Sequence, residues 1–95
     1  ADTLKNIAHQ IRQADSSSII VIGSGYEGKA ALVVGLGEKA AGSGRLNAVE
    51  IIKAVSGEIN GGGGGQPFLA TAGGKKPEGL NGAVTKAVEM AKKML

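Results

Sequence analysis

Apolar residues in the first part of the chain follow a helical period. Leu4, Ile7, Ala8 and Ile11 recur at the i, i+3, i+4, i+7 spacing that brings side chains onto one face of an α-helix. The pattern predicts a helix over residues 3–14 whose apolar face packs on the rest of the domain.

Two short runs rich in β-branched residues come next, and they predict strands over residues 18–23 and 30–35. The segment between them, from Gly23 to Lys29, is rich in glycine and polar residues, which is typical of a hairpin turn. Both strands are so apolar that we expect them to be buried on both faces.

The helical period returns twice in the second half of the chain. A helix over residues 45–58 follows Ser43-Gly44, and a helix over residues 78–94 follows Pro77, which the first turn of a helix tolerates. Their apolar positions are Leu46, Val49, Ile52, Val55 and Ile59 in the first, and Leu80, Val84, Ala87, Val88, Ala91 and Leu95 in the second.

Five consecutive glycines, Gly61 to Gly65, separate these two helices. Glycine loses more conformational entropy on ordering than other residues and packs no side chain, so we expect a loop over residues 60–66. A third strand over residues 67–72 follows. The order αββαβα predicts a single domain of the α/β class, an α+β sandwich in which three helices cover a three-stranded sheet.

Composition narrows the chemistry. The 95 residues include no Cys and no Trp, which excludes disulfides and Cys-based metal sites. Eleven basic and eight acidic residues give a net charge of +3, which favours a polyanionic partner. The longest apolar run is far shorter than the roughly 20 residues of a membrane span. We expect a cytoplasmic domain that was excised from a longer protein and holds no metal or cofactor.

One motif matches the dinucleotide-binding fingerprint in its letters, because Gly23, Gly25 and Gly28 stand in the order G-x-G-x-x-G after a strand. The fingerprint needs a helix to begin at its third glycine. The residues after Lys29 favour a strand instead, so the hairpin interpretation is preferred.

Side chains for catalysis are sparse. His9 is the only histidine and lies off the apolar stripe, so we expect it to face solvent. The carboxylates are scattered singly and suit neither acid–base chemistry nor a divalent ion. Tyr26 and Phe68 are too few for a base-stacking platform. Catalysis within these residues is not expected.

The glycine run and nearby basic residues predict an anion site instead. Unshielded backbone amides bind phosphate well, and cations beside them would strengthen a contact to a nucleic-acid backbone. Solvated surface lysines are the alternative. The candidate nucleic-acid-binding residues are Gly63, Gly64, Gly65, Gln66, Lys75, Lys76, Lys39 and Arg45.

With these residues in view, the chain resembles the DHH-associated family, as found in the globular C-terminal domain of alanyl-tRNA synthetases. The matching residues are Glu27-Gly28-Lys29, Gly63-Gly64-Gly65, Pro67, Ala70, Ala72 and Gly73-Gly74. The pattern departs from the family at three positions: Gly62 replaces the usual Lys, Gln66 the usual Arg, and Thr71 the usual Gln.

The resemblance implies a tRNA-binding module that contacts the outer corner of an alanine-specific tRNA and bridges catalytic and editing domains of the same chain. ATP, magnesium and zinc would be bound by those other domains, and a homodimer is a further expectation. A second interpretation is the substrate-binding accessory domain of a DHH-superfamily phosphoesterase or oligoribonuclease, although that family's usual His after three glycines is Gln66 here. A purely structural or dimerisation module is the third.

Overall fold

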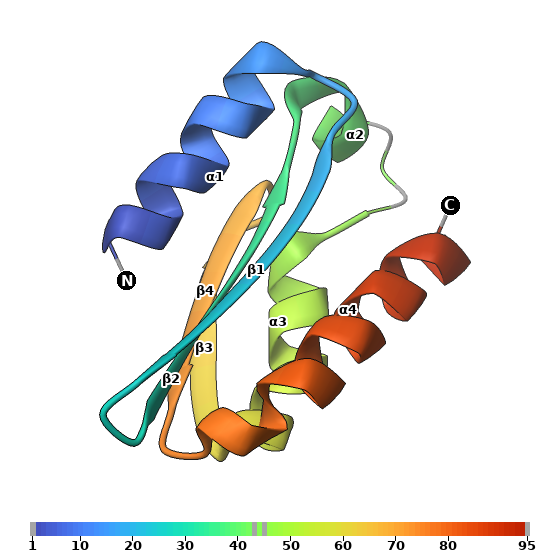
Figure 1. Ribbon diagram of the computed structural model, residues 1–95. Coiled ribbons are helices and arrows are strands. Elements are labelled where there is room, and N and C mark those ends of the chain that lie inside the picture. The colour runs from blue at the N-terminus through green and yellow to red at the C-terminus, as the bar shows by residue number, and fades with distance from the viewer. Residues whose placement is uncertain (1, 43, 45, 95) are drawn as a thin grey trace.

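The computed structural model describes residues 2–42, 44 and 46–94. Four strands form one antiparallel sheet, with α1 on one face and α3 and α4 on the other (Figure 1). In chain order the elements are α1 (Asp2–Ala14), β1 (Ile19–Tyr26), β2 (Lys29–Leu36), α2 (Glu38–Gly42), α3 (Ala48–Val55), η1 (Ser56–Ile59), β3 (Gly61–Gln66), β4 (Leu69–Gly74), η2 (Pro77–Gly79) and α4 (Leu80–Met94), where η marks a 3-10 helix.

The spatial order of the strands is β1-β2-β4-β3, so β1 and β3 are the two edges of the sheet. Both hairpins have two-residue turns: Tyr26 pairs with Lys29, and Gln66 pairs with Leu69. Positive φ angles at Glu27 and Gly28 confirm the expected turn between the first two strands.

The main core lies between the sheet and the helices α3 and α4. Leu32, Val34 and Leu36 project from β2 onto this side and are fully buried, as are Ile51 and Ile52 of α3. A smaller cluster lies on the opposite face, where Ala8 of α1 packs on the sheet residues Ile20, Val33 and Leu69. The central strand β2 therefore contributes side chains to both cores.

The expected three-stranded sheet with three helices is corrected by this arrangement. Within the described residues the sheet has a fourth strand, β3, which the glycine run forms where a loop was expected. A short helix, α2, lies between the predicted strand over 30–35 and the predicted helix over 45–58, where no element was expected. The other predicted elements are present with shifted ends. The expected strand over 67–72 begins two residues later because Pro67 and Phe68 form the turn. Ser43 and Leu95, which the predicted helices used as a start signal and a last apolar position, lie outside the described residues.

The strand β3 consists mainly of glycine because its backbone lies so close to β4 that alternate positions have no room for a side chain. A Cβ atom at Gly63 would lie 2.1 Å from the carbonyl oxygen of Thr71 and 2.7 Å from the Cα of Ala72. A strand with side chains at such positions could not pair in this register. Glycine has a weak preference for strands, so it is the pairing with β4 that stabilises the extended conformation of β3.

Hydrogen bonds hold the turn between β3 and β4 to its surroundings. The amide of Ala48, at the start of α3, donates to the carbonyl of Pro67 at 2.8 Å, and the amide of Leu36 donates to the carbonyl of Phe68 at 2.7 Å. Asn47 caps α3, since its side-chain oxygen accepts from the amide of Val49 at 3.0 Å. These contacts fix the end of the glycine strand.

Arg12 holds α1 against the sheet. Its Nε donates to the carbonyl oxygen of Leu36 at 2.8 Å, and its guanidinium carbon lies 4.6 Å from the centre of the Phe68 ring. The contact brings the C-terminal part of α1 to the turn that joins β3 to β4.

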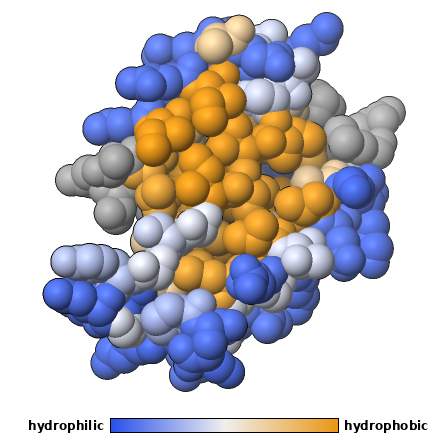
Figure 2. All heavy atoms as spheres, in the orientation of Figure 1, coloured by the Kyte–Doolittle hydropathy of each residue, from blue (hydrophilic) through white to orange (hydrophobic). Residues whose placement is uncertain are grey.

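The edge strand β1 and two flanking helices present an apolar face, which contradicts the expectation that both early strands are buried. Figure 2 shows this face at the centre of the molecule. Ile7 and Ile11, which were expected to pack inward, are 41% and 40% exposed, because Leu4 and Ala8 supply the inward side of α1. The other exposed large apolar residues of this region are Ile19 and Val88.

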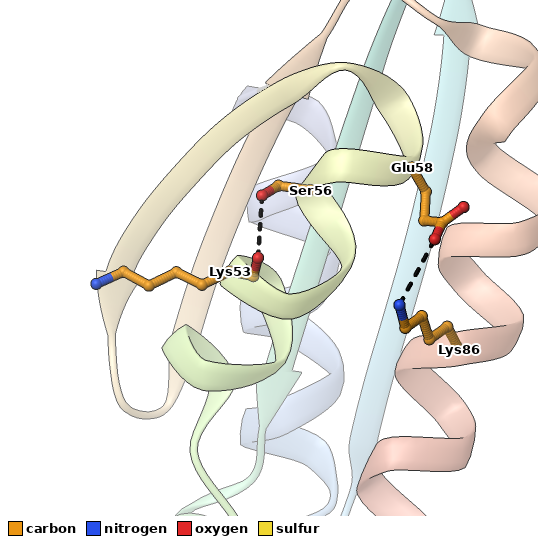
Figure 3. Close-up of polar contacts among 4 residues, drawn as sticks. All are labelled: Lys53, Ser56, Glu58 and Lys86. Carbon is orange, nitrogen blue, oxygen red and sulfur yellow. Dashed lines mark hydrogen bonds and ion pairs between the residues drawn. The ribbon is translucent and has the colours of Figure 1, made fainter.

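Polar contacts join η1 to its neighbours on the far side of the sheet from α1. Glu58 and Lys86 form an ion pair at 3.6 Å between η1 and α4, while the hydroxyl of Ser56 donates to the carbonyl of Lys53 at 3.3 Å (Figure 3). Both partners of the ion pair are about half exposed, so it contributes little to stability. None of the described helices has the length and apolar character needed to cross a membrane.

Candidate nucleic-acid interface

Alternate residues of the glycine strand face α1. Successive side chains of a strand point to opposite faces, and Leu69 belongs to the cluster under α1. Its partner Gln66 therefore projects toward α1, and the same face includes Gly64, which pairs with Thr71, and Gly62, which pairs with Gly73. Gly61, Gly63 and Gly65 face α3 instead.

A hollow of about 270 Å³ lies between α1 and this side of β3. We call it the α1–β3 hollow. Lys5 and His9 line it from α1, and Gln66, Thr71 and the backbone of Gly64 line it from the sheet. His9, which was expected to face solvent, is partly buried and lies at this hollow.

The backbone of the strand is accessible at the hollow. A Cβ atom at Gly64 or at Gly62 would meet no atom within 4 Å. Within the described residues, no hydrogen bond outside the strand pairing involves Gly61 to Gly65. An edge strand presents the N–H and C=O groups of alternate residues to solvent. The two-residue turn makes Gln66 and Leu69 a hydrogen-bonded pair, so the outward groups of β3 are those of Gly61, Gly63 and Gly65. A ligand can therefore approach the backbone here without displacing a side chain.

A second hollow, of about 510 Å³, continues along the same face of the sheet and shares Thr71 with the first. We call it the hairpin hollow, because Ser24, Tyr26, Lys29 and Ala31 of the β1–β2 hairpin line much of it. A third hollow, of about 480 Å³, lies at the end of β3 where Lys29 and Lys75 both border it.

The residues predicted from sequence to bind nucleic acid are distributed along the β3–β4 hairpin. Gly63, Gly64, Gly65 and Gln66 lie in β3, while Lys75 and Lys76 follow the far end of β4, where Gly74 pairs with Gly61. Gly61 and Gln66, at the two ends of β3, are five residue steps apart, a distance of roughly 17 Å along the strand. The lysines and Gln66 thus belong to opposite ends of one extended surface.

One predicted residue, Lys39, does not join this surface. It lies on α2 beside the turn after α1, where its amide donates to the carbonyl of Ser16 at 2.8 Å. The predicted residue Arg45 lies outside the described residues.

Lys5, Lys29 and Lys75 give this surface positive charge, and Glu27 lies in the turn beside Lys29. The salt bridge between Lys86 and Glu58 involves none of these lysines. Lys5 and His9 were missed from sequence. Their i, i+4 spacing, continued by Arg12 at i+7, is a signal of a basic helix face that could have drawn attention to them.

Taken together, these features define an accessory domain whose one basic face exposes a glycine-rich backbone. The DHHA1 domain family matches residues 1–93. The chain belongs to this family. Among solved structures it is similar to the C-Ala domain of alanyl-tRNA synthetase from Aquifex aeolicus, with 32% identity and a TM-score of 0.85 over 95% of this chain and 79% of that one.

Curated relatives agree with this assignment. The chain is 41% identical over 86 residues to alanine–tRNA ligase of Lactobacillus helveticus, covering 90% of this chain. It is 44% identical over 92 residues to alanine–tRNA ligase of Bacteroides thetaiotaomicron, covering 96% of this chain. In both comparisons the match spans 10% of the relative's length. The family resemblance inferred from the glycine and hairpin motifs is confirmed.

Proposed function

We propose that the chain is a tRNA-binding, non-catalytic module of an alanyl-tRNA synthetase, and that it holds the RNA backbone on the face formed by α1, β3 and β4. The observation that carries the proposal is the α1–β3 hollow. It brings the glycine backbone at Gly64 and Gly65 together with the side chains of Lys5 and His9 and a neutral hydrogen-bonding group, Gln66.

This combination suits a phosphodiester. Most protein contacts to nucleic-acid backbones come from basic side chains, neutral polar side chains and backbone N–H groups. Lys5 supplies a permanent charge, and the amide of Gln66 can donate to a phosphate oxygen or to a base edge. Lys29 and Lys75 add positive charge at the other end of the same surface.

The departures from the family pattern fall on the same face. Gly62, Gln66 and Thr71 all lie on the side of the sheet that α1 covers, so the usual Lys and Arg would stand at the edge of the same hollow. Here Lys5 and His9 of α1 lie across the hollow from Gln66. Lys5 supplies positive charge where the strand supplies none, and His9 adds a hydrogen-bonding ring, which supports a backbone contact despite the departures.

The other activities belong elsewhere in the parent chain. We place aminoacylation and editing, with their ATP, magnesium and zinc, in other domains, and we assign this module a contact to the outer corner of an alanine-specific tRNA in the cytoplasm. The support is the match to one tenth of the length of alanine–tRNA ligases. These relatives also favour the synthetase over a DHH-superfamily phosphoesterase.

A titration of fluorescently labelled tRNA with the 95-residue chain tests the proposal. At physiological salt we expect a Kd on the order of 10⁻⁴ to 10⁻⁶ M, and tighter binding at low salt, since the contact is electrostatic and independent of sequence. The slope of log K against log salt should become shallower by about 1 in Lys5→Gln, and likewise in Lys75→Gln. Gly64→Asp should weaken binding further, because it places a carboxylate in the hollow.

Lys53→Gln is the matched control. Lys53 lies on α3, on the opposite side of the sheet from α1, and its side chain is exposed. The variant loses the same charge as Lys5→Gln and should keep its affinity and most of its salt slope. Equal effects of the two substitutions, or no binding at low salt, would contradict the proposal.

The apolar face of β1 supports a second part of the proposal, contact with other domains of the same chain. Ile7, Ile11, Ile19 and Val88 are exposed together with the free edge of β1. Nine tenths of the length of the relatives lies outside the matched region, which supplies a partner for this face. Ile11→Glu should weaken association of the domain with the rest of the synthetase in a pull-down, whereas the control Lys53→Gln should associate as strongly as the unsubstituted chain.

Sedimentation of the isolated domain separates this idea from self-association. We expect a monomer for both the unsubstituted chain and Ile11→Glu. A dimer that Ile11→Glu dissociates would instead assign the face to a second copy of the domain, as a homodimer requires.

A further inference from the structure

We infer that the hairpin hollow binds an unstacked nucleobase against Tyr26, beside the backbone contact proposed above, on which this inference rests. The hollow has a volume of about 510 Å³, within the range of small-molecule sites. It is lined mainly by small and apolar groups. Such a site accepts a flat aromatic ligand more readily than a hydrated phosphate.

The hollow exists because α1 covers only part of its face of the sheet. In Figure 1 the β1–β2 hairpin extends past the N-terminal end of α1. Leu4 is the α1 residue that lines the hollow, and Ser24, Ala31 and Gly73 form one row across three neighbouring strands. Short side chains in this row leave room above the sheet.

Tyr26 stands at the rim of this space. Its side chain is 74% exposed, the largest exposure among the large apolar and aromatic residues that the described chain leaves at its surface. An aromatic ring beside a hollow offers a flat surface on which any base can stack. Two aromatic residues are too few for a platform that stacks several bases, but one exposed ring is enough to stack one base.

Polar groups around the ring match the rest of a nucleotide. Lys29 pairs with Tyr26 across the hairpin, so the two side chains project side by side on the same face. Its ammonium can contact the phosphate of the stacked nucleotide. The hydroxyl groups of Ser24 and Thr71 line the hollow and can donate to or accept from base edges.

The two hollows share Thr71, which makes the base site continuous with the α1–β3 hollow. A strand of RNA whose backbone lies on β3 can therefore place a neighbouring base over Tyr26. The ligand class that follows is RNA with at least one unpaired, unstacked nucleotide.

Two probes of equal charge test the inference: an octamer of uridylate and an abasic octamer with the same ribose-phosphate backbone. The 95-residue chain should bind the uridylate octamer about 5- to 150-fold more tightly, the effect of one base stacked on an aromatic ring. Tyr26→Ala should abolish this preference, while Tyr26→Phe should retain it. Because Tyr26 is so exposed, both variants should fold, which circular dichroism can verify.

Tyrosine fluorescence gives an independent readout. The chain has one Tyr and no Trp, so its emission comes from Tyr26 alone. Uridylate should quench this emission and the abasic octamer should not. Equal affinity for the two octamers, or an unchanged preference in Tyr26→Ala, would overturn the base site while leaving the backbone contact in place. Failure of both octamers to bind at low salt would overturn the proposed function and the base site together.

Discussion

The glycine strand makes a sharp prediction for two adjacent positions. A methyl group added at Gly63 would lie 2.1 Å from the carbonyl oxygen of Thr71, whereas a methyl group added at Gly64 would meet nothing within 4 Å. Gly63→Ala and Gly64→Ala change the composition of the chain in the same way. Their effects on stability should nevertheless have opposite signs.

The size of the difference follows from the geometry. Close contacts between carbon and a carbonyl oxygen are about 3.3 Å or longer, so a methyl group at Gly63 overlaps the carbonyl oxygen of Thr71 and the pairing of β3 with β4 must shift to make room. Hydrogen bonds of about 2.9 Å would then exceed the distance at which they hold. Losing one or two of them costs about 1–3 kcal/mol. Gly64→Ala should stabilise by about 0.4–1 kcal/mol, because it restricts the unfolded chain.

Thermal unfolding followed by circular dichroism measures both effects. For a domain of this size, 1 kcal/mol corresponds to a shift in Tm of about 4–8 °C, so Gly63→Ala should lower Tm by roughly 5–20 °C and Gly64→Ala should raise it by a few degrees. Equal Tm values for the two variants would refute the reasoning. That result is what a mobile loop over residues 60–66 would give.

Three further substitutions test contacts that fix the elements around the site. Arg12→Ala should lower the free energy of unfolding by about 1–3 kcal/mol in urea titrations, since it removes a partly buried hydrogen bond and the contact with Phe68. Asn47→Ala should cost about 0.5–2 kcal/mol in the same titrations, through loss of the cap on α3. Hydrogen bonds from the side chain and backbone of Ser17 lower the pKa of Asp15 in the folded protein. These hydrogen bonds stabilise the fold fully above the pKa that Asp15 has in the unfolded chain, and the stabilisation is lost as the pH falls through its lower pKa in the folded protein. Stability measured from pH 5 downward should therefore fall less steeply in Asp15→Asn.

Local patterns predicted most of the fold. The helical period identified α1, α3 and α4, and the β-branched runs identified β1 and β2. The structure contains a helix or a strand in each of these segments, as the spacing of the apolar residues predicts. The turn at Glu27 and Gly28 followed from composition in the same way. These features depend on interactions between residues close in sequence.

The glycine strand could not be predicted by the same means. Its order comes from pairing with β4 and from the anchored turn at Pro67 and Phe68, and five glycines carry no hydrophobic period that reveals such pairing. The exposure of Ile7 and Ile11 was missed for a related reason. A helical period gives the apolar side of α1, but the width of the sheet beneath decides how much of that side is covered.

The α1–β3 hollow was predicted in part. Sequence analysis identified Gly64 and Gln66 because unshielded backbone amides bind phosphate well. It did not identify Lys5 and His9, which α1 brings to the hollow from about 60 positions earlier in the chain. Tyr26 was discounted because aromatic residues are few, and only the three-dimensional arrangement shows the hollow that its small neighbours leave.

Mapping of backbone amide signals by NMR tests the proposed tRNA interface most directly. When tRNA is added to the ¹⁵N-labelled chain at low salt, we predict that signals from Lys5, His9, Gly64 and Gln66 shift or broaden together. Signals from the exposed side of α3, such as Lys53, should stay in place. Changes concentrated on α3 and α4, with the glycine strand unaffected, would contradict the proposed interface.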